Sequence, residues 1–248
     1  RAGHDRGLAG SSVGQARVKT MHRFFVAPEL LKSENTRVML PDKLAHQVKD
    51  VLHLGPGEQL ILLDNSGDEV LCGVVKSGRT GVEVELLERR AGKPEAPVRI
   101  ILCQGLLKSA RFEWILEKGT ELGVAVFAPI LCRRSMAGLE DAGPGKLQRW
   151  QRIIQEATEQ CGRARMPELL PIRPLMHALA DIPPAALALI PWEEEQDLSL
   201  RDALAGQREK AGNLTVVLFI GPEGGLVAEE IKLAQRHNVQ AVTLGPRI

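Results

Sequence analysis

The sequence is poor in aromatic residues: it has no Tyr, three Trp and five Phe, so platforms on which nucleobases stack are scarce. Its four Cys are scattered and form no C-x-x-C pair, which argues against a metal site and against a disulfide framework. No apolar run approaches the roughly 20 residues of a membrane span. The formal net charge of +1 argues against a surface that binds nucleic acid everywhere. We therefore expect a cytoplasmic protein without metal or membrane, whose basic surface is local.

The chain does have enough apolar material for a core. Its 248 residues, 44% hydrophobic and 25% charged, fit one large or two small globular domains. Residues 1–20 lack apolar periodicity and precede a Met at position 21, so we expect a disordered leader or tag outside the fold. Their arginines and serines also fit a transit peptide, and the alternative to the cytoplasm is therefore import into an organelle.

Residues 21–92 show patterns typical of β-strands, in HRFFVA, EQLILLDNSGDEVLCGVV and GVEVELLE. A helix is predicted near 41–54, where apolar residues recur at helical spacing. Charge, Gly and Pro are concentrated in 88–97, which we interpret as a linker between two domains.

Strands alternate with helices over residues 98–248, which predicts a mainly parallel α/β sheet. Ligands of such sheets collect beyond the carboxyl ends of the strands. Three loops fall at such ends: LIPWEE (189–194), FIGPEGG (219–225) and TLGPRI (243–248).

The loop FIGPEGG matches no common phosphate-binding pattern. No Lys and hydroxyl residue follow its last glycine, and the spacing is not G-x-G-x-x-G. One interpretation is a tight strand-to-helix turn whose glycines meet backbone demands alone. The other is a cofactor site, in which bare backbone amides hold a flat heterocycle, and the three similar loops favour it.

Four motifs in this order resemble one family: EKGTELGV (117–124), RWQRIIQEATEQCGRARMPEL (149–169), IGPEGG (220–225) with Glu230, and LGPRI (244–248). The chain from residue 22 onward resembles the RsmE-type 16S rRNA uridine-N3 methyltransferases of the SPOUT class. The resemblance implies an N-terminal PUA-like β-barrel that binds RNA (21–92) and a C-terminal α/β domain tied in a trefoil knot (98–248). It also implies S-adenosylmethionine (AdoMet) as methyl donor, a homodimer, and a uridine of the small ribosomal subunit as target.

Three positions depart from the family pattern. Val227 stands where a Ser or Thr usually caps a helix, a loss of about 1 kcal/mol. His53 replaces an Arg, which weakens any RNA contact there. Relatives continue beyond Ile248 with a segment that finishes the third cofactor loop, so we expect the C-terminus of this sequence to be incomplete.

The resemblance assigns the cofactor to the three loops. The residues expected to bind it are Leu189, Ile190, Pro191, Gly221, Pro222, Glu223, Gly224, Gly225, Leu244, Gly245 and Ile248. For Ile190 and Leu244 the alternative is plain strand core.

Uridine N3 keeps its proton at neutral pH, so methylation there needs a base, or a cation that stabilises the developing oxyanion. Glu223 and Arg163 are the predicted catalytic residues. The alternatives are a carboxylate stabilised by a helix N-terminus and a cation at a solvated helix end.

RNA contact has a local basis, because residues 146–165 carry five cations against two carboxylates. The predicted RNA-binding residues are Arg23, Arg133, Arg134, Arg149 and Arg165. Trp192 is the candidate for stacking a base, with a core role as the alternative. Trp114 and Trp150 are expected in the core or in a dimer interface.

The predicted homodimer has a candidate interface in one helix. Trp150, Ile153, Ile154, Ala157 and Cys161 share a face, which a symmetry mate would bury or which covers the protein's own sheet. Two other functions stay open: a ribose 2′-O-methyltransferase of the same fold, and a catalytically silent RNA-binding module.

Overall fold

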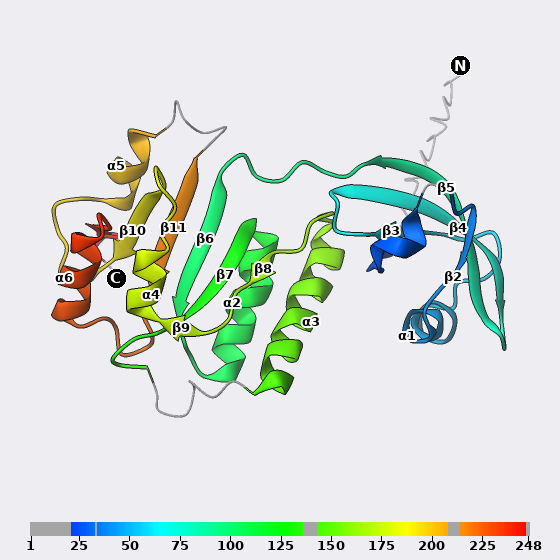
Figure 1. The fold of residues 1–248 in the computed structure, drawn as a ribbon, viewed down its shortest axis with the longest axis horizontal. Coiled ribbons are helices and arrows are strands. Elements are labelled where there is room, and N and C mark those ends of the chain that lie inside the picture. The colour runs from blue at the N-terminus through cyan, green and yellow to red at the C-terminus, as the bar shows by residue number, and fades with distance from the viewer. Residues whose placement is uncertain (1–20, 33, 136–142, 208–213, 247–248) are drawn as a thin grey trace, which may run out of the picture.

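The computed structural model describes residues 21–32, 34–135, 143–207 and 214–246, which form two sheets joined by a short linker (Figure 1). The predicted leader 1–20 and Ile248 lie outside the described residues. The strands are β1 (Arg23–Phe25), β2 (Arg37–Met39), β3 (Gln59–Leu63), β4 (Asp68–Gly78), β5 (Gly81–Ala91), β6 (Arg99–Gly105), β7 (Val124–Leu131), β8 (Glu168–Leu169), β9 (Arg173–Pro174), β10 (Leu187–Pro191), β11 (Thr215–Ile220) and β12 (Gln240–Val242). The helices are η1 (Pro28–Leu31), α1 (Asp42–His46), η2 (Gln47–Val51), α2 (Ser109–Glu121), α3 (Pro144–Cys161), α4 (Leu175–Ala180), α5 (Leu200–Ala205) and α6 (Ala228–Arg236).

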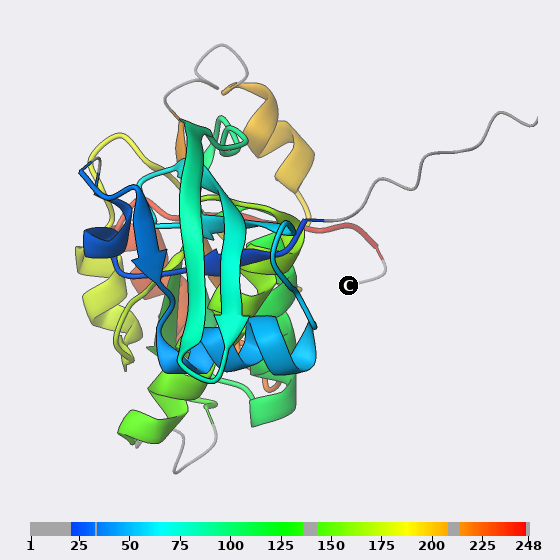
Figure 2. The same cartoon turned by 90° about the vertical axis from the view of Figure 1, so that its right-hand side faces the viewer.

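The first sheet has the strand order β1-β3-β4-β5-β2, antiparallel except for the pair β1–β3. Figure 2 shows β4 and β5 as a long hairpin, with α1 across its lower end. The turn between β3 and β4 has Asn65 at φ +67° and Gly67 at φ +100°. Apolar side chains that alternate along these strands, such as Leu60, Leu62, Val82 and Val84, close one core on this side of the linker.

The second sheet is parallel throughout, in the order β12-β10-β11-β6-β7-β8, with β9 also beside β7. The predicted α/β class is therefore confirmed. Because all strands run the same way, the carboxyl ends of β10, β11 and β12 meet at one edge.

Helices cover both faces of this sheet. Successive residues of β6 point to opposite faces, so Leu102 packs with α2 and α3, and Cys103 packs with α4 and α6. In α3, Trp150 is fully buried and its ring centroid lies 4.4 Å from that of Phe112 in α2. The near-continuous apolar sequence of β6, β7 and β11 follows from this double burial.

The structure corrects the interpretation of the α3 face. Trp150, Ile154 and Ala157 are at most 5% exposed because they pack inside their own chain. The buried part of the stripe therefore packs against α2 and the protein's own sheet, and the prediction that these residues form a dimer interface is wrong; Ile153 and Cys161 are partly buried. Trp114, expected in the core or in an interface, is 61% exposed, which excludes the core.

The packing of α2 on β7 leaves no room at Gly119. A Cβ atom there would lie 2.7 Å from Cε1 of Phe127, whose ring is fixed in the core. We expect Gly119→Ala to lower the free energy of unfolding by about 1–3 kcal/mol, although Ala gains about 1 kcal/mol in helix propensity. The control is Gly145→Ala in α3, where a Cβ meets no atom within 4 Å and should not destabilise. Urea unfolding measures both, and a Gly119→Ala protein as stable as wild type would contradict this packing.

Candidate active site

Three loops at the carboxyl edge of the parallel sheet enclose a cavity of about 260 Å³. They follow β10, β11 and β12, which are distant in the sequence but adjacent in the sheet. The lining residues are Pro191, Trp192, Glu193, Gly221, Pro222, Glu223, Gly224, Gly225, Leu226 and Leu244. The structure thus brings together the three loops that the sequence singles out.

The glycine loop after β11 is pressed against the end of β6. A Cβ atom at Gly105 would lie 2.6 Å from the nitrogen of Pro222, so only glycine fits there. Gly225 has φ +71°, a conformation that glycine adopts without strain, and its N–H donates to the carbonyl of Pro222. Within the described part of the chain, the N–H groups of Glu223 and Gly224 donate to no acceptor. They are two neighbouring donors free for a ligand.

Gln104 holds the start of this loop, and the sequence interpretation missed it. Its side chain is buried, and Nε2 donates to the carbonyl oxygens of Gly105 (3.0 Å) and Gly221 (3.3 Å). A buried amide at a strand end is stable only with such partners. The available signal was the single polar side chain in the apolar run IILCQG (100–105).

The side chain of Glu223 contacts the N-terminus of α2. Its Oε1 accepts long hydrogen bonds from the N–H of Lys108 (3.5 Å) and from Nη1 of Arg111 (3.4 Å). Lys108 is the N-cap of α2, so the helix that stabilises this carboxylate is α2, not the helix that follows the loop. Glu223 stays exposed and accessible to a ligand.

The loop after β7 closes the site from another side. Arg134 donates from Nη1 to the carbonyl of Gly224 at 2.7 Å, and its Cβ lies 3.1 Å from where a Cβ of Gly224 would be. Arg133 and Arg134 are both exposed beside the glycine loop. Of the arginines predicted to bind RNA, these two lie next to the cavity.

Glu230 joins this loop to α6. The side chain is 6% exposed; its Oε1 accepts from the N–H of Arg133 (2.8 Å) and its Oε2 from the N–H of Val227 (3.0 Å). Val227 offers no side-chain oxygen to cap α6, so Glu230 supplies only the reciprocal half of a capping box. The missing cap is thereby partly offset.

The other predicted cofactor residues divide between core and cavity. Leu189 and Ile190 are completely buried, so only Pro191 of that strand lines the cavity. Leu244 is 42% exposed at the rim, and Gly245 beside it has φ +112°. Trp192 is half-buried, so it both packs on the core and lines the cavity.

The structure does not bring Arg163 to this site. Its guanidinium pairs with Glu95 at 2.5 Å and donates to the carbonyls of Thr120 and Val124, both at 2.9 Å. Val124 begins β7, so Arg163 lies at the amino edge of the sheet, about 20 Å of strand from the glycine loop. Its donors are spent on holding the linker, and a catalytic role beside Glu223 in the same chain has no support in this geometry.

The remaining predicted RNA contacts also lie elsewhere. Arg23 is only 19% exposed at its side chain and pairs with Glu69. Arg165 is exposed where α3 leads into β8, beside the turn at Gly67. Arg149 is exposed on α3 and pairs with Glu113 of α2 at 2.7 Å.

The cavity therefore offers two free amide donors, apolar surfaces from Trp192 and Leu226, and two carboxylates, Glu193 and Glu223. Among the described residues, no three His, Cys, Asp or Glu side chains come together as metal ligands do. Nor does any described helix have the length and apolar character to cross a membrane. The arrangement fits an organic ligand with a flat apolar part and polar ends.

Comparison with known proteins finds a matching family and relatives that span most of the chain. Residues 94–248 match the family described as RNA methyltransferase domain. The chain is 28% identical to ribosomal RNA small subunit methyltransferase E of Bacillus subtilis, over 92% of this chain and 90% of that protein. It is 33% identical to the Mycobacterium bovis protein of the same name, over 80% and 75% of the two chains.

Two solved structures have the same fold. One is ribosomal RNA small subunit methyltransferase E from Neisseria gonorrhoeae bound to S-adenosyl methionine, with a TM-score of 0.80, 30% identity, and 92% and 90% of the chains covered. The other is a putative methyltransferase from Legionella pneumophila in complex with the same cofactor, with a TM-score of 0.79, 28% identity, and 92% and 90% covered.

The buried bridge made by Glu230 gives a test of how the site is held. Glu230→Ala leaves the N–H groups of Arg133 and Val227 without their acceptor, which should cost about 1–3 kcal/mol of unfolding free energy. Hydrogen exchange at these two amides should accelerate together. Glu230→Gln keeps one acceptor oxygen and should retain slow exchange at one amide only. Unchanged exchange at both amides in Glu230→Ala would contradict the bridge.

Proposed function

The chain belongs to the RNA methyltransferase family matched by residues 94–248, and on this premise we propose that it transfers a methyl group from AdoMet to N3 of a uridine in 16S rRNA of the small ribosomal subunit. The observation that carries the proposal is the cavity formed by three loops at the carboxyl edge of the sheet. The AdoMet-bound relatives share this fold over nine-tenths of the chain, which supports a cofactor site at that edge.

The residues of the cavity fit AdoMet. The free N–H groups of Glu223 and Gly224 suit the polar edge of its adenine or its carboxylate, and Trp192, Leu226 and Leu244 supply apolar contact. Glu193 provides an acceptor for hydroxyl or ammonium groups. AdoMet supplies an activated methyl group, so the protein's tasks are to position the two substrates, exclude water and handle one proton.

Glu223 is the group we assign to that proton. It is an exposed carboxylate of the cavity, and it makes only long contacts with Lys108 and Arg111. Those weak contacts leave its oxygens able to accept the N3 proton of uridine. Arg111 and Arg134 then face the same loop as cations, where they would stabilise negative charge on the base.

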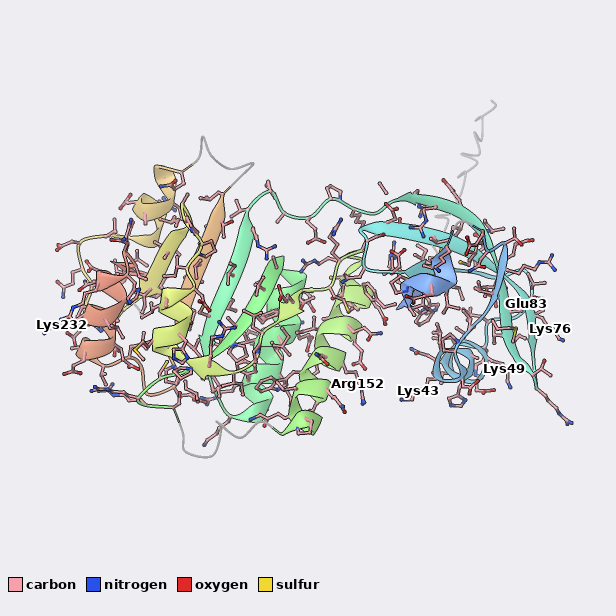
Figure 3. All side chains as sticks on the ribbon, viewed as in Figure 1. Lys43, Lys49, Lys76, Glu83, Arg152 and Lys232 are labelled. Carbon is pink, nitrogen blue, oxygen red and sulfur yellow. The ribbon has the colours of Figure 1, made fainter. Side chains whose placement is uncertain are left out.

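We further propose that residues 21–92 are a PUA-like RNA-binding barrel and residues 98–248 the catalytic domain. The separate cores on the two sides of the linker support the division. Figure 3 shows Lys43 and Lys49 on the lower side of the barrel, with Arg152 of α3 toward the same side. Cations from helices on both sides of the linker therefore lie toward one side of the molecule, where contacts to phosphates would give affinity without sequence preference.

A trefoil knot and a homodimer complete the proposal. The chain after β12 runs beside the connection after β10, since the N–H of Thr243 donates to Leu198 and that of Leu200 to Thr243. A segment that passes along this connection supports a knot. For the dimer, the exposed apolar residues Trp114 of α2 (61%) and Leu122, which directly follows α2 (79%), replace the buried α3 stripe as candidates. Cytoplasmic location stays a prediction.

The cofactor site is tested at Gly224. A valine there pushes on the side chain of Arg134, only 3.1 Å from the added Cβ, and displaces the loop. We expect calorimetry to show AdoMet binding to wild type and at least a tenfold weaker affinity for Gly224→Val, about 1.4 kcal/mol or more. Gly55→Val in the barrel, where an added Cβ meets no atom within 4 Å, is the matched control. Equal affinity for AdoMet in all three proteins would refute the assignment of the cofactor to this loop.

The reaction itself is tested on ribosomal RNA. Small subunits from a strain that lacks this gene should gain one methyl group at N3 of a uridine when treated with wild-type protein and AdoMet. Glu223→Gln should bind AdoMet normally and methylate at least a hundredfold more slowly, in the range typical of a lost general base. A methyl group found on a ribose 2′-oxygen would refute the uridine-N3 assignment. Absence of AdoMet binding would favour a silent RNA-binding module.

A further inference from the structure

The two sheets are fastened to each other by a seam at the amino edge of the parallel sheet. On the barrel side it consists of the turn 64–67 and Gly92; on the other side it is the end of α3 with the chain that follows it, 159–166. Figure 1 shows this end of α3 reaching the barrel. The function proposed above assigns no role to these residues.

The turn contributes a hydrogen bond made by Asn65. Its Oδ1 accepts from the N–H of Met166 at 2.7 Å, and its backbone has φ +67°, which Asn tolerates better than most residues. The turn is itself fixed, because Arg89 pairs with both Asp64 and Asp68 at 3.2 Å. The fixed turn therefore holds Oδ1 of Asn65 in place as an acceptor for the chain that follows α3.

Two glycines let the backbones approach. A Cβ at Gly92 would lie 2.5 Å from Cβ of Ala164 and 2.8 Å from the carbonyl oxygen of Gly67. Ala164 is 3% exposed and packs with Ile61 and Leu63 of β3. A residue of the α/β side is thus part of the apolar surface of the barrel.

Glu159 adds a polar contact between the sheets. Its Oε1 accepts from the N–H of Phe25 in β1 at 3.0 Å and from Nε2 of Gln155 at 2.9 Å. Burial raises the pKa of this carboxyl group, which the two hydrogen bonds oppose. Without the Glu159 carboxylate, the N–H of Phe25 would lose its acceptor in the closed seam, which disfavours closure.

Arg163 holds the linker against the parallel sheet. It ties Glu95, in the linker, to the carbonyls of Thr120 and Val124. Domains joined only by a flexible linker move relative to one another by default. Here contacts hold both the linker and the seam, and these contacts oppose such a motion.

We propose that this seam positions the reaction: it holds the RNA-binding barrel at a fixed place relative to the cofactor loops, so that RNA bound on the barrel delivers its target uridine to Glu223. The proposal rests on the function proposed above. Asn65, Gly92 and Glu159 are positioning residues, since they contact neither the cavity nor its loops. A displacement of the reacting atoms by about 1 Å costs roughly a hundredfold in rate, so a small opening of the seam is enough to be measured.

The first test opens the seam with one methyl group. Gly92→Ala should push Ala164 of the α/β side away from the barrel, because the added Cβ would lie 2.5 Å from that of Ala164. Gly55→Ala, in the same barrel and with no atom within 4 Å of the added Cβ, is the matched control. Small-angle X-ray scattering of the full chain should show a larger radius of gyration for Gly92→Ala only. Its kcat on small subunits should fall at least tenfold, with the Kd for AdoMet within twofold of wild type. The control should behave as wild type in all three measurements.

The second test removes a hydrogen bond without adding volume. Asn65→Gly keeps the positive φ but loses the acceptor for Met166, whereas Asn65→Asp keeps an acceptor oxygen. We expect kcat to fall in Asn65→Gly and to recover in Asn65→Asp. Asn238→Gly, at another positive φ of +61°, controls for the change of Asn to Gly and should leave kcat unaltered.

Two results would overturn the seam as a positioning device. One is a radius of gyration of Gly92→Ala that equals that of wild type. The other is a larger particle whose kcat stays within twofold of wild type. A wild-type protein that binds no AdoMet and methylates no RNA would instead refute the proposed function, and with it the positioning role. Scattering would then still show whether the seam joins the two sheets.

Discussion

Parallel pairing of β10, β11 and β12 is the constraint on which the candidate site depends. Strands that run the same way place their carboxyl ends together, so loops about 30 and 20 residues apart along the chain become neighbours. The contact between Gly105 and Pro222 then sets how deeply the central loop sits. Gln104, Arg134 and Glu230 fix its remaining freedom through hydrogen bonds to backbone groups.

The two edges of this sheet carry different tasks. The carboxyl edge exposes glycines, free amides and carboxylates, which suits a ligand. At the amino edge, charged side chains bind other parts of the protein. Arg163 pairs with Glu95 and donates to two backbone carbonyls, and Glu159 accepts a hydrogen bond from the N–H of Phe25. Arginines that look alike in the sequence thus have opposite roles, depending on the edge at which the chain places them. Arg134 borders the cavity, whereas Arg163 holds the linker.

The sequence was sufficient for the features that depend on local pattern. Alternating strands and helices predict the parallel sheet, and bare loops after apolar runs predict the edge where a ligand binds. It was not sufficient where the partner of a residue decides its role. The apolar spacing in α3 identifies a buried face, but spacing alone does not say whether α2 or a second subunit buries Trp150. The motif around Arg163 likewise does not show at which edge of the sheet the chain lies after α3. Gln104 was missed because it lies within an apolar strand.

Hydrogen exchange of the protein with and without AdoMet reports both edges of the parallel sheet in one experiment, and so distinguishes a cofactor site at the carboxyl edge from one at the amino edge. We expect AdoMet to slow exchange in 191–193, 221–226 and 243–246, with the largest effect at the amides of Glu223 and Gly224. We expect no change at 159–166 or at the turn 64–67. Protection confined to the residues around Arg163, with the glycine loop unaffected, would refute a cofactor site at the carboxyl edge.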